Sequence, residues 1–140
     1  MDVAIPIFDG LTALDAIGPY EVLSRLPDAH VHFLAAEPGP KRTGNQMLAF
    51  TADAALDDLR TPDVIVMPGG HGTRALMHDE QMLGWVRAAH VTSRWTTSVC
   101  TGSLAPAIQL AIEYDPEPPF DSGSTSKASP AVLELARARA

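Results

Sequence analysis

Cys100 is the one cysteine of the 140-residue chain and its best candidate for a nucleophile. Residues 93–99 before it are rich in β-branched side chains and predict a strand, whereas the residues after it have helical spacing. A nucleophile on a sharp turn from strand to helix is a nucleophile elbow, which needs small residues two positions to either side. Ser98 and Gly102 meet that requirement. The segment therefore predicts an exposed thiol at a tight corner.

The start of the following helix would assist a thiol placed there. A thiol reacts as its thiolate, and the partial positive charge of a helix N-terminus favours that anion. Backbone N–H groups from Thr101 onward could also hold an oxyanion that develops on a substrate. The alternative is that Cys100 is a small buried apolar residue, a common role for free cysteines. The other motifs favour the catalytic interpretation.

Asp15 is the candidate acid or base. It follows the predicted strand 3–8 at its carboxyl end, where open α/β sheets place their sites. A carboxylate there could transfer protons to and from a substrate. The competing interpretation is an ordinary carboxylate that caps a helix or faces solvent.

A glycine-rich loop follows the predicted strand 63–67. Glycines in Pro68-Gly69-Gly70 would let backbone N–H groups approach a ligand closely, although a tight turn would explain them as well. His71 comes next and could line the same pocket. No set of histidines and cysteines has the spacing of metal ligands, so we expect no metal and no cofactor.

The elements that must position these residues alternate between strand and helix. Short apolar runs predict four strands, at 3–8, 30–36, 63–67 and 93–99. Helical patterns cover 12–17, 20–26 beyond a break at Gly18-Pro19, 79–89 with Asp79 as its cap, and 101–113 with a kink at Pro106. We expect a short hairpin within 41–53, weak helix at 54–59, and Trp85 and Trp95 in the core.

This alternation predicts an α/β fold, a three-layer sandwich with a mainly parallel, flavodoxin-like sheet. A hydrophobic content of 46% and a charged content of 19% fit one globular domain. The net charge of −7 argues against nucleic acid or an anionic membrane as partner. A single cysteine, no leader-like N-terminus and no long apolar run predict a cytoplasmic location.

Three segments together resemble the ThiJ/PfpI superfamily, which has a class I glutamine amidotransferase-like fold. They are residues 14–23, residues 63–70 and the elbow, and the tail 107–124 matches as well. Within the superfamily they look most like the isonitrile hydratase group. The resemblance implies a lyase that adds water to a small isonitrile and gives an N-substituted formamide. By analogy it also implies a homodimer.

The resemblance assigns roles to individual residues. It implies that Cys100 is the nucleophile, that Asp15 is the acidic partner, and that Thr101 supplies an N–H and a hydroxyl. It also implies that Gly69 and Gly70 lend N–H groups to an oxyanion hole. The proteolytic branch often has a histidine directly after its cysteine, and here that position is Thr101.

The chain departs from this pattern after the elbow. Relatives carry several dozen further residues between the elbow helix and the tail, whereas here Ser103-Leu104-Ala105 runs directly into the tail. We therefore expect an α/β domain over 1–113 that is truncated after the elbow helix, and a Pro/Ser/Gly-rich arm with a short terminal helix over 114–140. The elbow strand would lie at or near a sheet edge. A non-catalytic ligand-sensing module, an inactive shortened paralogue and a redox sensor remain the alternatives.

Overall fold

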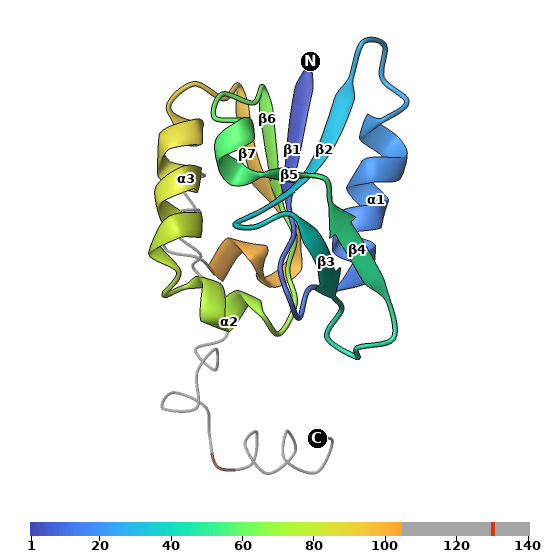
Figure 1. The fold of residues 1–140 in the computed structure, drawn as a ribbon, viewed down its shortest axis with the longest axis vertical. Helices are drawn as coiled ribbons and strands as arrows, with labels where there is room; N and C mark the ends of the chain where they lie inside the picture. The colour runs from blue at the N-terminus through green and yellow to red at the C-terminus, as the bar shows by residue number, and fades with distance from the viewer. Residues whose placement is uncertain (105–129, 131–140) are drawn as a thin grey trace.

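A five-stranded parallel sheet forms the centre of the molecule (Figure 1). The computed structural model describes residues 1–104 and residue 130. The strands are β1 (Asp2–Pro6), β2 (His30–Ala35), β5 (Ala54–Ala55), β6 (Val64–Met67) and β7 (Trp95–Ser98), in the order β5-β2-β1-β6-β7. Each neighbouring pair is parallel, in agreement with the expected flavodoxin-like α/β fold.

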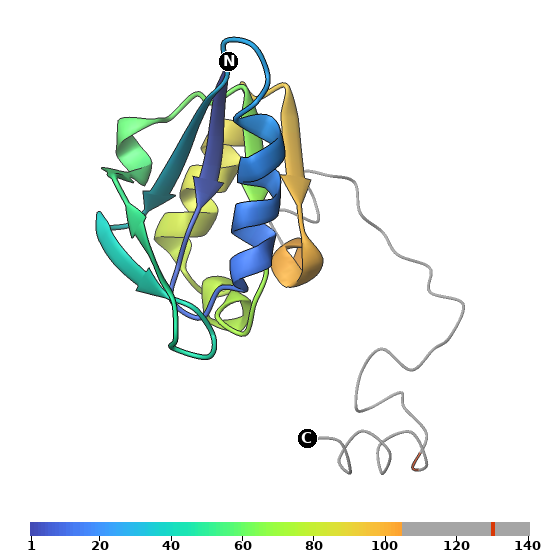
Figure 2. The same ribbon diagram turned by 90° about the vertical axis from the view of Figure 1, so that its right-hand side faces the viewer.

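Helices cover the two faces of the sheet. Figure 2 shows α1 (Ala13–Leu23) on one side and α3 (Glu80–His90) on the other, which is the predicted three-layer arrangement. Shorter pieces are η1 (Leu56–Asp58), α2 (Thr73–Leu76) and η2 (Cys100–Leu104). The expected helix 101–113 lies outside the described residues beyond Leu104, as does the arm 114–140 apart from Pro130.

The two central strands form the core. Every residue of β6, and every residue of β1 after Asp2, is buried, because these strands are covered on both faces. On one side of the sheet α3 adds five buried side chains, and Asp79 caps the helix as predicted by accepting from the N–H groups of Gln81 and Met82 at 3.0 Å each. Trp85 is buried as expected, and its indole N–H donates to the carbonyl of Leu59 at 3.1 Å.

The predicted break in the first helix is wrong. α1 runs without interruption and contains Pro19, which removes only the N–H that would bond the carbonyl of Asp15 one turn earlier. Thr12 occupies the N-cap position, but its side chain makes no capping hydrogen bond. Leu23 near the end of this helix packs against the core, whereas Val22 is 66% exposed.

Two corrections concern the strands. Residues 54–59, predicted as weak helix, form the short strand β5 and η1, so the sheet has a fifth strand. Trp95, predicted in the core, is 60% exposed, and β7 is the edge strand of the sheet that residues 1–104 form. The edge position of the elbow strand was itself predicted, as was the hairpin, formed by β3 (Gly39–Arg42) and β4 (Ala49–Ala52).

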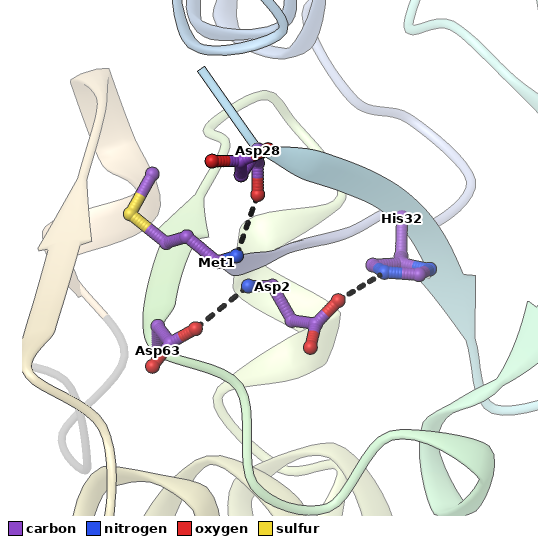
Figure 3. A network of polar contacts seen from close by, with 5 residues as sticks. All are labelled: Met1, Asp2, Asp28, His32 and Asp63. Carbon is purple, nitrogen blue, oxygen red and sulfur yellow. Dashed lines mark hydrogen bonds and ion pairs between the residues drawn. The ribbon is translucent and has the colours of Figure 1, made fainter. Parts of the chain in front are cut away.

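Polar contacts hold the amino end of β1 between its neighbours (Figure 3). The N-terminal ammonium donates to the carbonyl of Asp28 at 2.6 Å, and the N–H of Asp2 donates to Oδ2 of Asp63 at 2.7 Å. Oδ1 of Asp2 lies 3.0 Å from Nε2 of His32, and this hydrogen bond lowers the pKa of the Asp2 carboxyl.

Within the described part of the chain, no helix combines the length and the apolar character that crossing a membrane requires.

Candidate active site

Cys100 has the backbone conformation of a nucleophile elbow. Its φ is +53°, a left-handed value that residues other than glycine rarely adopt, and its side chain is exposed. The turn is held on both sides, because the N–H of Val99 donates to the carbonyl of Met67 at 2.9 Å and that of Gly102 donates to the carbonyl of Val99 at 3.0 Å. A Cβ at Gly102 would lie 2.3 Å from the carbonyl oxygen of Met67, so only glycine fits there. The alternative of a buried cysteine is thereby excluded.

Asp15 lies in the first turn of α1 and is only 7% exposed. Its Oδ2 accepts a hydrogen bond from the N–H of Gly69 at 3.1 Å, which fixes the carboxylate against the loop that follows β6. A buried carboxylate that accepts from a backbone N–H differs from the solvated helix-capping residue that was the competing interpretation.

Thr101 is bonded to the same loop. Its hydroxyl accepts from the N–H of Gly70 at 2.9 Å and lies 3.2 Å from the carbonyl oxygen of Gly70. The hydroxyl of Thr73, a buried residue that the sequence interpretation did not include, lies 3.3 Å away. Nothing in the sequence singled out Thr73, because the contact depends on how α2 packs beside η2.

The glycine pair therefore contacts both candidate residues. In this structure its two N–H groups donate to the side chains of Asp15 and Thr101. A Cβ at Gly69 would lie 2.6 Å from the backbone N of Thr101 and 3.0 Å from Oδ2 of Asp15, so no larger residue fits between them. That the N–H groups of Gly69 and Gly70 donate hydrogen bonds to an oxyanion stays a prediction.

His71 lies apart from this contact and lines a cavity of about 520 Å³. The cavity is bounded by the segment Gly10–Leu14 and by the loop between β3 and β4, with Thr43, Asn45, Met47 and Leu48 among its walls. Cys100 and Asp15 do not line it. The loop contribution was not anticipated from the sequence, because it results from packing between segments some thirty residues apart.

Among residues 1–104 and 130, no group of three or more histidine, cysteine, aspartate or glutamate side chains could hold a metal ion. The chemistry available to the described site is that of one thiol, one carboxylate, hydroxyl groups and backbone N–H donors.

Comparison with known proteins gives consistent matches. The family model described as DJ-1/PfpI family matches residues 1–111. Isonitrile hydratase from Pseudomonas putida is 30% identical over 208 aligned residues, which cover 100% of this chain and 90% of the relative. That alignment covers the whole chain but is longer than its 140 residues. The relative therefore carries internal residues that have no counterpart in this chain, in agreement with the expected missing segment.

Solved structures give the same fold. A ThiJ/PfpI family protein from Pseudomonas syringae superposes with a TM-score of 0.72 at 22% identity, covering 99% of this chain and 84% of that one. Oxidized DJ-1 from Toxoplasma gondii gives a TM-score of 0.65 at 17% identity, covering 74% of this chain and 58% of that one.

Proposed function

Because the chain belongs to the DJ-1/PfpI family, we propose that it is a cysteine-dependent lyase that hydrates a small isonitrile to an N-substituted formamide. The family resemblance assigns the roles, and the geometry of the site supports them. Cys100 is the nucleophile, Asp15 transfers protons, and Thr101 helps to orient the substrate. The relative from Pseudomonas putida supplies the reaction class.

The reaction needs two steps. In the first, the thiolate of Cys100 forms a bond to the terminal carbon of the isonitrile while that carbon takes a proton from Asp15, which gives a thioimidate. In the second, the Asp15 carboxylate takes a proton from water as the water oxygen adds to the same carbon. The hydroxyl proton then moves to nitrogen, the C–S bond breaks, and the formamide leaves with the thiolate restored.

One observation supports this proposal most directly. Cys100 lies exposed in the left-handed conformation of an elbow, directly before Thr101. The backbone N of Thr101 and Oδ2 of the buried Asp15 both lie within 3.0 Å of the position that a Cβ at Gly69 would occupy. A strained backbone at a lone exposed thiol is unfavourable for folding, and such strain concentrates at functional sites.

Hydration of cyclohexyl isocyanide tests the proposal, with N-cyclohexylformamide measured by gas chromatography. Cys100→Ala should abolish turnover, and Asp15→Asn should lower kcat/KM by at least about a hundredfold, the usual range for loss of a general acid–base group. Glu21→Gln is the matched control, because Glu21 is an exposed carboxylate on the same helix. A Cys100→Ala variant that hydrates the isonitrile at the parent rate would refute the mechanism.

A second candidate function is ligand sensing without turnover. It is favoured by the position of the 520 Å³ cavity, which is lined by His71 and by both polar and apolar side chains but not by Cys100. Under this hypothesis the parent binds cyclohexyl isocyanide in calorimetry without producing formamide, Cys100→Ser binds it equally well, and His71→Ala weakens binding. Formamide production by the parent would exclude it.

A further inference from the structure

We propose that Thr73 is a positioning residue of the candidate active site, and that it makes the hydroxyl of Thr101 a hydrogen-bond donor toward the reacting molecule. This role rests on the proposed function and adds a residue of α2 to the set Cys100, Asp15 and Thr101. It also specifies which atom of the reacting molecule the Thr101 hydroxyl binds.

The Thr73 hydroxyl is withdrawn from solvent. Thr73 is 1% exposed, and within the described part of the chain its Oγ1 contacts one polar side-chain atom, Oγ1 of Thr101 at 3.3 Å. A buried hydroxyl proton without an acceptor destabilises a protein, so buried donors are almost always paired. The Thr73 proton is therefore donated to the oxygen of Thr101.

The contacts of the Thr101 hydroxyl then fix the direction of each hydrogen bond. Its oxygen accepts from the N–H of Gly70 at 2.9 Å, and it lies 3.2 Å from the carbonyl oxygen of Gly70, which can only accept. A hydroxyl has one proton and two lone pairs. The N–H of Gly70 and the hydroxyl of Thr73 occupy both lone pairs, so the Thr101 proton is directed to the Gly70 carbonyl.

A hydroxyl with both lone pairs occupied has only its proton to offer a bound molecule. The Gly70 carbonyl also accepts from the N–H of Thr73 at 3.2 Å, so it keeps a partner when the Thr101 proton turns away from it. Thr101 is partly exposed and directly follows the exposed Cys100. Its proton is therefore available to an acceptor atom of a molecule bonded to Cys100.

The proposed reaction creates an acceptor of this kind. The nitrogen of an isonitrile has no free lone pair, because that pair takes part in the triple bond to the terminal carbon. Once the Cys100 thiolate has added and the carbon has taken its proton, the thioimidate nitrogen carries a lone pair. A donor at Thr101 thus binds the intermediate and the transition states beside it, but not the isonitrile. Such an interaction contributes to kcat and leaves KM nearly unchanged.

Steady-state kinetics with cyclohexyl isocyanide test this role. Thr73→Val replaces the hydroxyl by a methyl group, and kcat should fall by about three- to tenfold, the usual effect of one hydrogen bond, with KM within about twofold of the parent. Thr73→Ser keeps the hydroxyl and should retain a kcat close to that of the parent. Thr97→Val is the matched control, since it removes a threonine hydroxyl that donates to the carbonyl of Ile65 at 2.9 Å, and it should not change kcat.

A double-mutant cycle shows whether Thr73 acts through Thr101. In a Thr101→Val background the partner hydroxyl is absent, so adding Thr73→Val should lower kcat no further. The rate at which iodoacetamide alkylates Cys100 should be the same in Thr73→Val as in the parent, because the elbow keeps its backbone hydrogen bonds. A residue that only supports the fold would instead change the alkylation rate and give additive losses in the cycle.

Thr73→Ala supplies the comparison if Thr73→Val does not fold. The serine and alanine variants differ by the hydroxyl alone, and the serine variant should have the higher kcat by the same factor. An active parent overturns the role of Thr73, and leaves the proposed function intact, if removal of this hydroxyl does not lower kcat or if the losses are additive with Thr101→Val. A parent that produces no formamide refutes the proposed function itself, and the role of Thr73 falls with it.

Discussion

At the scale of single residues, the site depends on backbone positions that only particular side chains tolerate. An L-residue in the left-handed region costs about 1 kcal/mol relative to its right-handed form, and Cys100 is held there by the hydrogen bonds of its neighbours. Gly69 and Gly102 allow the loop after β6 and the elbow to approach each other within contact distance. The thiol is directed outward because these small residues let the turn close beneath it.

Gly69→Ala tests this close approach. Its Cβ would press on the backbone of Thr101 and on the Asp15 carboxylate, so we expect the free energy of unfolding to fall by about 1–3 kcal/mol, as for other overpacked sites. Gly84→Ala in α3 is the matched control, because a Cβ there has nothing within 4 Å. It should be neutral or stabilising by up to about 1 kcal/mol. Urea unfolding measures both, and equal effects would contradict the close-approach argument.

At the scale of elements, three adjacent parallel strands assemble the site. β1 leads to Asp15, β6 to Gly69 and Gly70, and β7 to Cys100, and these strands are neighbours in the sheet. The carboxyl ends of parallel strands meet at one edge of the sheet. The loops that follow these strands therefore converge although they are far apart in the sequence. Met67 and Ser98, the last residues of β6 and β7, are paired in register, which places the glycine loop beside the elbow.

α3 contributes stability to this arrangement by covering one face of the sheet. Asp79→Ala removes the acceptor of two N-terminal N–H groups and should lower the free energy of unfolding by about 1 kcal/mol, whereas Asp79→Asn keeps an acceptor and should lose much less. Thermal unfolding followed by circular dichroism compares the two. Equal losses would mean that the capping hydrogen bonds are not what Asp79 contributes.

At the scale of the whole molecule, the two ends of the sheet have different tasks. The carboxyl end carries the candidate site, while the amino end carries the contacts of Met1, Asp2 and His32 that anchor β1 (Figure 3). The hydrogen bond to His32 lowers the pKa of Asp2 below its ordinary value of 3.8. The ionised Asp2 carboxylate therefore stabilises the folded state above pH 3.8. This contribution to stability disappears as the pH falls through the lowered pKa of the folded state.

Asp2→Asn tests the pH dependence. At about pH 5.5 the variant should be less stable than the parent by no more than about 1 kcal/mol, because the pair lies at the surface. The difference should shrink as the pH falls well below 3.8, where the parent carboxyl is protonated in both the folded and the unfolded state. Urea titrations at the two pH values give the comparison, and a constant difference would show that ionisation of Asp2 is not involved.

The sequence by itself determined the elements with strong local signals. Buried apolar runs specified β1, β2 and β6, Asp79 marked the start of α3, and the small residues around Cys100 marked the elbow. These features depend on neighbours within a few positions, so they can be read along the chain. The motifs also sufficed to identify the family.

Only the tertiary structure decided what depends on distant segments. Trp95 is exposed because nothing described covers the outer edge of β7, and α1 continues through Pro19 although the proline removes one hydrogen bond of the helix. The two-residue strand β5 exists because β2 lies beside it. The sequence also did not determine which groups accept from the N–H groups of Gly69 and Gly70. Asp15 and Thr101 belong to other elements, which only the folded sheet brings next to this loop.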